Sequence, residues 1–423
     1  MDSRKVCIVG LGYVGLPLAC LCAEKGYSTI GYDINSKIIE HLKDGITIIE
    51  DKILKNKIKN FSDKIVYSFD PKIIQSADII IICVPTPIKT DYKPNLDPLI
   101  SAVNTIKHNL KYGALVIIES TIYPGTSEEI VLPIFANLKC GKDYFLAHCP
   151  ERIDPGNAEW DVSNIPRVIG GVTEQCADLA IDFYRSIISA DILRLNSIKA
   201  VEATKVMENS FRDINIAFMN EMAKSFDKMG IDIMDVIRAA STKPFSFLPH
   251  YPGCGVGGHC IPVDPYYLIE KAKETGFEHK FLMLAREINN SMPLYTTELV
   301  VDALNELGLS VKDTKISILG LAYKPDVNDI RESPSFKIIN FLRKKGANLL
   351  IYDPFIPDQS NVSTIYEALD CDCLVLVTSH SEFKDISPQL LKDKRVRAVI
   401  DGRNLFDKND IIAHGIIYKG IGR

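Results

Sequence analysis

The sequence contains no apolar run long enough to cross a membrane and no strong excess of charge of one sign. A bilayer-spanning helix needs roughly 20 consecutive apolar residues, whereas the longest continuous run, Ile79 to Val84, has the length of a strand. Residues 1–5 lead straight into a strand pattern without the longer apolar core of a signal peptide. The formal net charge of -5 excludes a broad phosphate-binding surface. We therefore expect a cytoplasmic protein with neither a membrane nor a nucleic-acid partner.

The cysteines lack the paired Cys-x-x-Cys spacing that is typical of a zinc site. The sequence has 11 of them, an odd number, and Cys371-Asp372-Cys373 is too closely spaced for a zinc clip. Most of the 11 lie inside apolar runs: Cys7, Cys20, Cys22, Cys83, Cys371 and Cys373. The sequence therefore predicts buried free thiols in a reducing compartment and no metal centre.

Short apolar runs alternate with helical patterns in the first and last parts of the chain. Lys5 to Val9, Ser28 to Tyr32 and Ala114 to Glu119 read as buried strands, and "KISILGLAYK" after residue 314 resembles "KVCIVGLGYV" after residue 4. Such alternation is typical of a parallel sheet covered on both faces. We predict an α/β protein with two Rossmann-like, doubly wound domains of related design.

The middle of the chain is helical. Residues 197–229 contain neither glycine nor proline, and apolar residues recur there at helical spacing, which predicts one long helix. Further helices are expected from Asp232 to Ala240 and from Tyr266 to Ser291. The predicted parts are an N-terminal α/β domain over residues 1–196, a central helical domain with a cysteine loop over 197–300, and a C-terminal α/β domain over 301–423, with the long helix and helical linker joining the outer two.

A glycine motif, Gly10-Leu11-Gly12-Tyr13-Val14-Gly15, follows the first strand and opens a helix. Asp33 closes the next strand, as the dinucleotide-binding fingerprint requires. A carboxylate at this position repels the 2′-phosphate of NADP, so NAD is the expected cofactor, although Lys37 lies close to the expected adenine ribose. The alternative is a glycine turn without a cofactor. Two later turns, with Pro85 and Thr86 in one and Thr121 in the other, follow strands of the same sheet.

A second glycine-rich segment, "YPGCGVGGHCIPVDPYYL" from Tyr251 to Leu268, carries two cysteines. Glycine-rich backbone near a helix start can approach a ligand closely, and a thiol there can be nucleophilic. Cys260 is the better candidate because it lies next to the expected helix start. Cys254 is its rival, and a buried inert thiol is the ordinary state of any single cysteine.

The sequence resembles the UDP-glucose/UDP-mannosamine dehydrogenase family. The matching motifs occur in family order over nearly the whole chain: "VGLGYVGLPLA" (9–19), "CPERIDPGN" (149–157), "EATKVMENSFRDINIAFMNE" (202–221), "GVGGHCIPVDP" (255–265), "LAYKPDVNDIRESPS" (321–335) and "DGRN" (401–404). Together these motifs are highly specific.

The resemblance implies that the domain over residues 1–196 binds NAD and that the domain over 301–423 binds UDP. It also implies roles for individual residues. Cys260 matches the family nucleophile, Lys205 and Asn209 the pair that holds an oxyanion, Asp264 a carboxylate that assists proton transfer, and Glu151 and Thr121 the groups that guide water. The implied cofactor contacts are Gly10, Gly12, Tyr13, Val14, Gly15, Asp33, Lys37, Pro85, Thr86, Thr121 and Arg331. The implied substrate contacts are Glu151, Arg152, Lys205, Asn209, Tyr251, Gly257, Lys324 and Arg403. Taken singly, Lys205 reads as a solvated helix charge and Asp264 as a carboxylate favoured by a helix dipole.

The implied activity is a two-step oxidation of the 6-hydroxymethyl group of a UDP-sugar to a carboxylate, with a thiohemiacetal and a thioester on Cys260. The motifs look most similar to the branch that acts on UDP-N-acetylhexosamines, and within it to UDP-N-acetylglucosamine 6-dehydrogenases. UDP-N-acetylmannosamine, UDP-N-acetylgalactosamine and UDP-glucose stay open as substrates.

Two other functions are compatible with parts of the sequence. A β-hydroxyacid dehydrogenase shares the first glycine motif and a long-helix domain, but needs neither a cysteine nucleophile nor a second α/β domain. An NAD-binding regulator would not need Cys260, Lys205 and Asn209. The long helix also predicts a homodimer or higher homo-oligomer, in which Lys243 could reach a neighbouring subunit's site.

Overall fold

The computed structural model describes residues 4–47, 49, 52–153, 157 and 159–423, so part of the "CPERIDPGN" motif lies outside the described residues. The chain forms two compact units. The first comprises Met1–Glu208 and Val263–Glu278, and the second comprises Asn209–Pro262 and His279–Arg423. The chain passes between the units at three places, of which the first, after Glu208, lies inside a helix, and each unit is described by itself.

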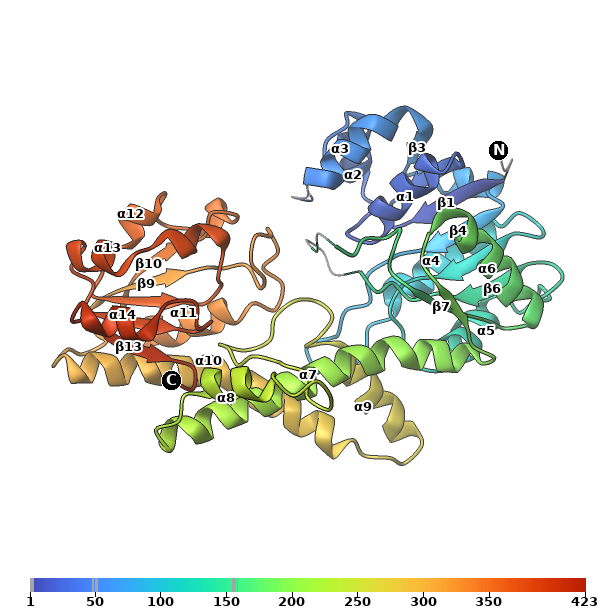
Figure 1. Cartoon of the computed structure of the whole chain (residues 1–423). Coiled ribbons are helices and arrows are strands. Elements are labelled where there is room, and N and C mark those ends of the chain that lie inside the picture. Colours follow the sequence, from blue (N-terminus) through green and yellow to red (C-terminus); the bar gives the residue numbers. More distant parts are fainter. Residues whose placement is uncertain (1–3, 48, 50–51, 154–156, 158) are drawn as a thin grey trace. The chain divides into compact units, whose positions relative to one another are not determined.

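The first unit is built on an eight-stranded sheet in the order β3-β2-β1-β4-β5-β6-β7-β8 (Figure 1). Every neighbouring pair is parallel except β6 and β7, which are antiparallel. The strand order reverses between β1 and β4, which is the switch point where ligands of such sheets bind. The strands are β1 (Lys5–Val9), β2 (Ser28–Tyr32), β3 (Ile65–Ser68), β4 (Ile79–Ile82), β5 (Leu115–Ile118), β6 (Phe145–His148), β7 (Arg167–Gly171) and β8 (Ile192–Arg194).

Both faces of this sheet are buried, as continuous apolar strands require. The four isoleucines of β4 are at most 1% exposed, and alternate ones enter two separate hydrophobic clusters. The covering helices are α1 (Gly15–Glu24), α2 (Ser36–Lys43), α3 (Lys52–Phe61), α4 (Asp97–His108), α5 (Leu132–Ile134) and α6 (Glu174–Ile187).

The second unit contains a five-stranded parallel sheet in the order β10-β9-β11-β12-β13. Its strands are β9 (Lys315–Leu319), β10 (Asn348–Tyr352), β11 (Cys373–Leu376), β12 (Ala398–Asp401) and β13 (Ile417–Gly420), and its helices include α11 (Pro334–Lys344), α12 (Ile365–Ala368), α13 (Pro388–Asp393) and α14 (Lys408–Ala413). The two sheets share one turn geometry, because the amide of Gly10 donates to the carbonyl of Tyr32 and that of Gly320 to Tyr352, each at 2.9 Å. The predicted pair of related α/β domains is confirmed.

The helical part departs from the prediction at one place. α7 (Ile198–Lys228) is a single helix of 31 residues, and α8 (Ile233–Ala240) follows it, as predicted. The single helix predicted from Tyr266 to Ser291 is wrong, because α9 (Asp264–Glu274) ends at Gly276, whose φ of +78° suits the glycine of a helix C-terminus. α10 (Lys280–Glu306) then starts anew and runs past residue 300, with Pro293 in its interior.

Candidate active site

The first glycine motif forms a turn that only glycines can make. Gly10 has a φ of +96°, and a Cβ on Gly15 would lie 1.9 Å from the carbonyl oxygen of Gly10. A Cβ on Gly12 would meet nothing within 4 Å, so the backbone there borders open space. The turn leads from β1 into α1, whose first amides carry the positive end of the helix dipole. Tyr13 and Val14 are half-buried beside it. This geometry fits a pyrophosphate against the backbone of Gly12.

Asp33 lies at the end of β2, where the fingerprint requires an acceptor. One of its oxygens accepts the amide of Leu11 and the other the amide of Asn35, each at 2.9 Å. Each carboxylate oxygen has a second lone pair, so the side chain can still accept a ribose hydroxyl. Lys37 is exposed in the first turns of α2. The residues present therefore fit NAD.

Side chains from α9 and α7 hold the turns that follow β4 and β5. The hydroxyl of Tyr267, on α9, donates to the carbonyl of Thr86, next to the exposed Pro85. Glu202, on α7, accepts the amides of Gly125 and Ser127, which follow Thr121 in the "ESTIYPG" turn. Sequence reasoning gave Tyr267 and Glu202 no role, although both lie inside the motifs quoted above, because neither residue type shows which distant turn it contacts.

Glu151 follows β6 and is only 6% exposed. The neighbouring Arg152 forms an ion pair with Glu208 at 2.6 Å. One oxygen of Glu151 accepts the amides of Arg152 and Ile153, at 2.7 and 2.8 Å. The other lies 2.7 Å from the guanidinium of Arg167. Arg167 is another residue that sequence reasoning missed, because at the head of an apolar strand it looks like an ordinary solvated strand end.

Lys205 and Asn209 lie on successive turns of α7, and each is only 9% exposed. The spacing of four residues places them on one face of the helix, as predicted. The interpretation of Lys205 as a solvated charge is wrong. Burying an ammonium group costs free energy that a surface lysine does not incur, which marks this face as more than a solvated surface.

The two cysteines of the second glycine-rich segment have different surroundings. Cys254 is fully buried, with its sulfur so close to Gly402 that a Cβ there would lie 2.1 Å away. Burial raises the pKa of the Cys254 thiol. Cys260 is partly exposed in the loop before α9, and the buried Asp264 is the first residue of that helix. Of the two thiols, Cys260 is the one that a substrate can reach.

The loop that carries Cys260 packs against other parts of the second unit. The amide of Gly253 donates to Asn220 on α7, and the amide of Gly258 donates to the carbonyl of Arg331, each at 2.9 Å. A Cβ on Gly257 would lie 2.7 Å from Tyr323, so no larger residue fits there without a shift. The loop is therefore held against the "LAYKPDVNDIRESPS" motif.

The basic residues predicted to bind nucleotide parts lie in the same unit. The Nε of Arg403 donates to the carbonyl of Val377 at 2.7 Å, and a Cβ on Gly253 would lie 2.9 Å from its Nη1. Arg331 is bound through its Nε and Nη2 by the carboxylate of Asp329. Lys324 is half-buried, whereas Tyr251 is 58% exposed. Lys243 places its ammonium 5.0 Å from the ring centre of Phe245.

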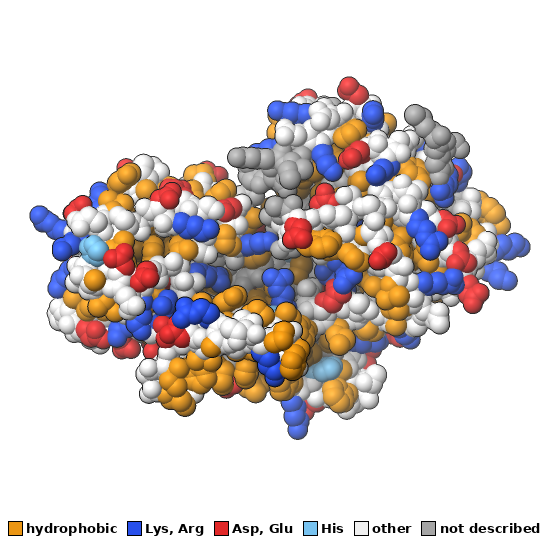
Figure 2. Space-filling view, viewed as in Figure 1, with side chains coloured by type: hydrophobic (Ala, Val, Ile, Leu, Met, Phe, Trp, Pro, Cys, Tyr) orange, Lys and Arg blue, Asp and Glu red, His pale blue; other side chains and the backbone are white. Residues whose placement is uncertain are grey.

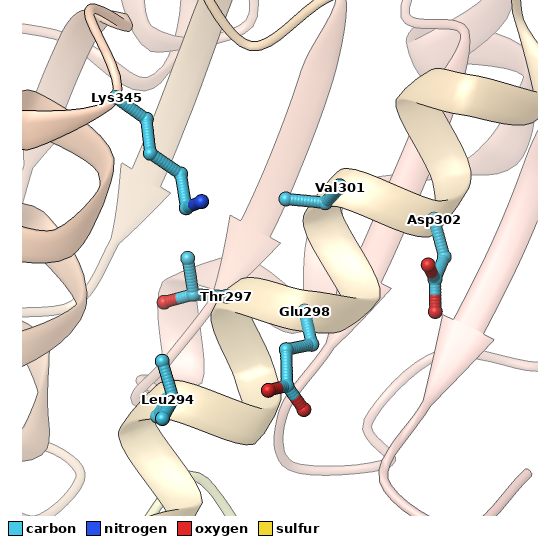
Figure 3. A pocket seen from close by; sticks show the side chains of 6 residues that line it. All are labelled: Leu294, Thr297, Glu298, Val301, Asp302 and Lys345. Carbon is cyan, nitrogen blue, oxygen red and sulfur yellow. The ribbon is translucent and has the colours of Figure 1, made fainter.

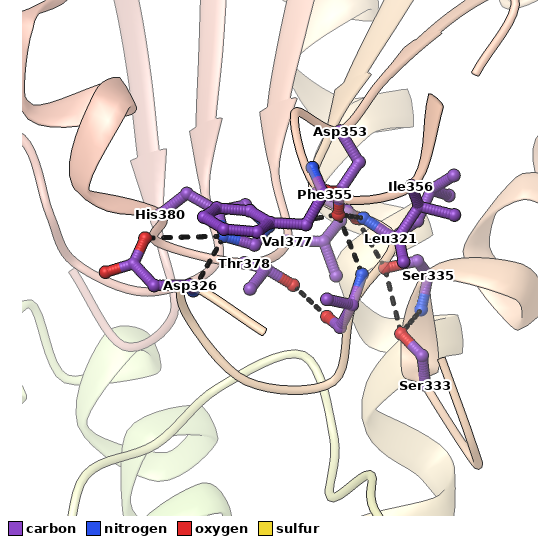
Figure 4. A network of polar contacts seen from close by, with 12 residues as sticks. Leu321, Asp326, Ser333, Ser335, Asp353, Phe355, Ile356, Val377, Thr378 and His380 are labelled. Carbon is purple, nitrogen blue, oxygen red and sulfur yellow. Dashed lines mark hydrogen bonds and ion pairs between the residues drawn. The ribbon is translucent and has the colours of Figure 1, made fainter. Parts of the chain in front are cut away.

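A buried histidine fixes the turn that follows Lys324 (Figure 4). The amide of Asp326 donates to the Nδ1 of His380 at 2.9 Å, so the Nε2 carries the proton and donates to Asp353 at 3.0 Å. Asp353 also accepts the amides of Leu321 and Ala322. Burial works against ionisation, but the hydrogen bonds from His380 and these amides outweigh it and lower the pKa of Asp353.

Two surface hollows contain none of the predicted site residues. One of about 200 Å³ lies between α10 and Lys345, lined by Leu294, Thr297, Glu298, Val301 and Asp302 (Figure 3). Another, of about 600 Å³, is lined by charged side chains of both signs around Tyr123 and α9. In the part of the chain that the structure describes, no cluster of three or more His, Cys, Asp or Glu could hold a metal ion. None of the described helices has the length and apolarity to cross a membrane.

Comparison with known proteins identifies the family. Three consecutive family models of UDP-glucose/GDP-mannose dehydrogenases match: the NAD binding domain over residues 4–188, the central domain over 199–291 and the UDP binding domain over 317–408. The chain is 36% identical to the UDP-N-acetyl-D-mannosamine dehydrogenase of Pyrococcus horikoshii, over 99% of both chains. It is also 36% identical to the UDP-N-acetyl-D-glucosamine 6-dehydrogenase of Pseudomonas aeruginosa, over 97% of this chain and 99% of that one.

The fold agrees with these sequence matches. The solved structure of the Pyrococcus horikoshii enzyme superposes with a TM-score of 0.93 at 35% identity, over 99% of each chain. The resemblance read from the motifs is thereby confirmed. The chain belongs to the UDP-glucose/GDP-mannose dehydrogenase family and is an NAD-dependent UDP-sugar dehydrogenase.

Proposed function

We propose that the chain oxidises the 6-hydroxymethyl group of UDP-N-acetylglucosamine to the carboxylate, with Cys260 as its covalent nucleophile. The observation that carries the nucleophile assignment is the contrast between the two thiols of one loop: Cys254 is fully buried against Gly402, whereas Cys260 is partly exposed next to the start of α9. A nucleophile must be reached by its substrate, and a helix start favours the thiolate.

When bound, NAD would supply the hydride acceptor for each of the two oxidations. In the first, Lys205 or an ordered water takes the hydroxyl proton and C6 becomes an aldehyde. The thiolate of Cys260 then attacks this carbon and forms a thiohemiacetal, whose oxyanion Lys205 and Asn209 hold. The second oxidation leaves a thioester. Water, guided by Glu151 and Thr121, adds to the thioester carbon, the C–S bond breaks, and the acid leaves with Cys260 regenerated.

The remaining predicted residues are proposed as binding groups. Gly10, Gly12, Gly15 and Asp33, with the turns at Thr86 and Thr121, bind NAD, and Arg331 reaches it from the UDP-binding domain. Lys324 and Arg403 bind the UDP part, and Asp264 assists proton transfer beside Cys260. We likewise propose that the functional parts divide near residues 196 and 300.

The sugar is the least constrained part of this proposal. The relatives named above act on UDP-N-acetyl-D-mannosamine or UDP-N-acetyl-D-glucosamine, which supports an N-acetylhexosamine. Arg152, which pairs with Glu208 on α7, brings a polar side chain next to Glu151, where the UDP-glucose branch is expected to have an apolar one. We choose UDP-N-acetylglucosamine because the motif from Lys243 to Pro265 resembles that group most.

The test is a panel of UDP-sugars in which NADH formed is counted against sugar consumed. The expected result is the highest kcat/KM with UDP-N-acetylglucosamine and two NADH per sugar. A higher value with UDP-N-acetylmannosamine would move the substrate assignment to that epimer. One NADH per substrate would favour a β-hydroxyacid dehydrogenase, and no reduction with any UDP-hexose would overturn the proposal.

We further propose that the chain works as a homodimer through the helical part of its second unit. α7 exposes Phe211 at 49% and Phe218 at 51%, and Met229 and Ile231 are exposed where it leads into α8. Figure 2 shows hydrophobic side chains gathered over the face where α8 lies. Exposed apolar area of this kind is typical of an interface. Light scattering that gives the mass of one chain at micromolar concentration would contradict this.

A further inference from the structure

Four polar side chains lie buried together on one face of the first sheet. Glu119 follows β5, Glu151 follows β6, Arg167 begins β7 and Tyr184 lies on α6. Their exposures are 1%, 6%, 0% and 0%. Charged groups are seldom buried unless they are paired. This buried cluster, to which the proposed mechanism gives no role beyond Glu151, therefore calls for a physical explanation.

Arg167 is at the centre of the buried cluster. Its Nη1 lies 2.7 Å from the Oε2 of Glu151 and 3.7 Å from the Oε1 of Glu119. The hydroxyl of Tyr184 donates to that same oxygen of Glu119, and the ring of Tyr184 lies 5.6 Å from the guanidinium carbon. The guanidinium thus bridges two carboxylates, while Tyr184 contacts both Arg167 and Glu119.

The two oxygens of Glu151 are used differently. Its Oε1 accepts two backbone amides. Its Oε2 is close to Arg167, yet the direction of the guanidinium N–H groups leaves both Oε2 and Nη1 without a hydrogen-bond partner. Both atoms are buried, so the charge of Arg167 holds this edge of the carboxylate while the two amides hold the other.

The charges of the buried cluster do not balance if both carboxylates are ionised. Besides Arg167 and Tyr184, the groups that face Glu119 are Glu151 and the thiols of Cys22, Cys83 and Cys149, from α1 and from the ends of β4 and β6. Burial first, and the charge of Glu151 in addition, raise the pKa of Glu119 to about 8 against the opposing effect of Arg167. Burial therefore favours the protonated form of Glu119, which leaves Arg167 to pair with Glu151.

We propose that Arg167, Glu119 and Tyr184 are positioning residues that hold the carboxylate of Glu151 in place for release of the thioester. This inference rests on the proposed function. In the release step the water oxygen bonds to the thioester carbon, the C–S bond breaks, and one water proton passes to Glu151 while Cys260 leaves as a thiolate. Glu119 keeps its proton during this step, so it does not attract the guanidinium of Arg167 away from Glu151.

The test separates release from oxidation in the full-length enzyme. Rapid acid quench followed by intact mass measures the sugar adduct on Cys260, and absorbance measures NADH, for the parent and for Arg167→Lys and Glu119→Gln. Glu174→Gln, an exposed change at the start of α6, is the control. In Arg167→Lys we expect release to slow by at least about tenfold, with accumulated thioester and a burst of two NADH per chain.

Glu119→Gln gives a second readout that a purely structural role would not change. Glutamine imitates the protonated carboxyl, so release at neutral pH should slow far less than in Arg167→Lys. Above about pH 8, parent release should fall by up to about tenfold per pH unit as Glu119 ionises and competes for Arg167, whereas Glu119→Gln should lack this fall and Glu174→Gln should keep it.

Two outcomes would overturn the inference alone: the same alkaline fall in Glu119→Gln as in the parent, or equal slowing of oxidation and release in Arg167→Lys with no adduct. Absence of NADH from the parent with every UDP-hexose would instead overturn the proposed function, and the inference with it.

Discussion

At the scale of single residues, burial separates chemical groups that look alike in the sequence. Cys254 and Cys260 are six positions apart in one glycine-rich loop, but only Cys254 is fully buried. Lys205 is in a helix with many charged residues and is nevertheless 9% exposed. Neither difference follows from residue type or spacing, because both depend on which distant segment covers the side chain.

The two thiols should respond in opposite ways to removal. Cys254→Ala deletes a fully buried sulfur against Gly402 and should lower the free energy of unfolding by about 1–2 kcal/mol while turnover persists. Cys260→Ala should fold with unchanged stability but lose the second oxidation, so that at most one NADH forms per sugar and no acid is released. Urea unfolding and a UDP-sugar assay check both. Loss of turnover in Cys254→Ala at a temperature where it remains folded would reverse the assignment.

Asp33 should determine both the choice of cofactor and the shape of its turn. Asp33→Ala removes the acceptor for the amides of Leu11 and Asn35 and any bond to a ribose hydroxyl. We expect KM for NAD to rise by about tenfold or more, with a smaller loss for NADP because the repulsion of its phosphate is removed. Initial rates with both cofactors measure this, and an unchanged ratio of the two kcat/KM values would contradict it.

At the scale of elements, the loop that carries Cys260 is held by a series of hydrogen bonds between buried amide groups. Asn220 accepts the amide of Gly253 and donates to Asn289 on α10, which in turn donates to Asp213. The loop that carries Cys260 is therefore fixed to two helices before any ligand binds. Such preorganisation reduces the cost of ordering a catalytic group.

Breaking this series of hydrogen bonds should lower kcat more than it weakens the binding of UDP. Asn220→Ala leaves the buried amide of Gly253 unpaired, which should cost about 1–3 kcal/mol of stability, and kcat should fall more than the affinity for UDP. Asn215→Ala, at a half-buried position of the same helix, is the matched control. The expectation fails if the two variants have the same kcat, measured with affinity for UDP by calorimetry.

The elements also show how far the sequence could predict the structure. Continuous apolar strands and the glycine fingerprint are local patterns, and they predicted both sheets, the long α7 and the NAD turn. The break between α9 and α10 was missed because Gly276 is a weak signal inside a pattern that is helical on both sides. The partners of Glu151 were missed as well: Glu119, Arg167 and Tyr184 meet only through the pairing of distant strands.

At the scale of the whole molecule, the buried carboxyl of Glu119 makes stability depend on pH. Its pKa is raised to about 8 from an ordinary 4.5, so the unfolded chain releases this proton at a pH where the folded chain retains it. The contribution to stability is complete below about 4.5, decreases as pH rises, and is lost by about 8. Burial also raises the pKa values of Asp213 and Asp401, with the same sign.

A difference measurement isolates Glu119 from these other groups. The free energy of unfolding of Glu119→Gln minus that of the parent should grow more favourable to the variant as pH rises from about 5 to 8 and then level off. Urea titrations at several pH values measure it, with Glu174→Gln as the control. A difference that is constant with pH would show that Glu119 titrates normally in the folded protein.

Asp33 and Asp353 occupy corresponding turns of the two sheets, and the difference between them bears on how NAD is exchanged. Asp33 keeps lone pairs available at its turn, whereas Asp353 at the corresponding turn already bonds to two amides and His380. We therefore expect one NAD per chain, although each product consumes two. The first NADH must then depart and a fresh NAD arrive while the half-oxidised sugar waits, and a covalent tether to the protein prevents its escape during that exchange.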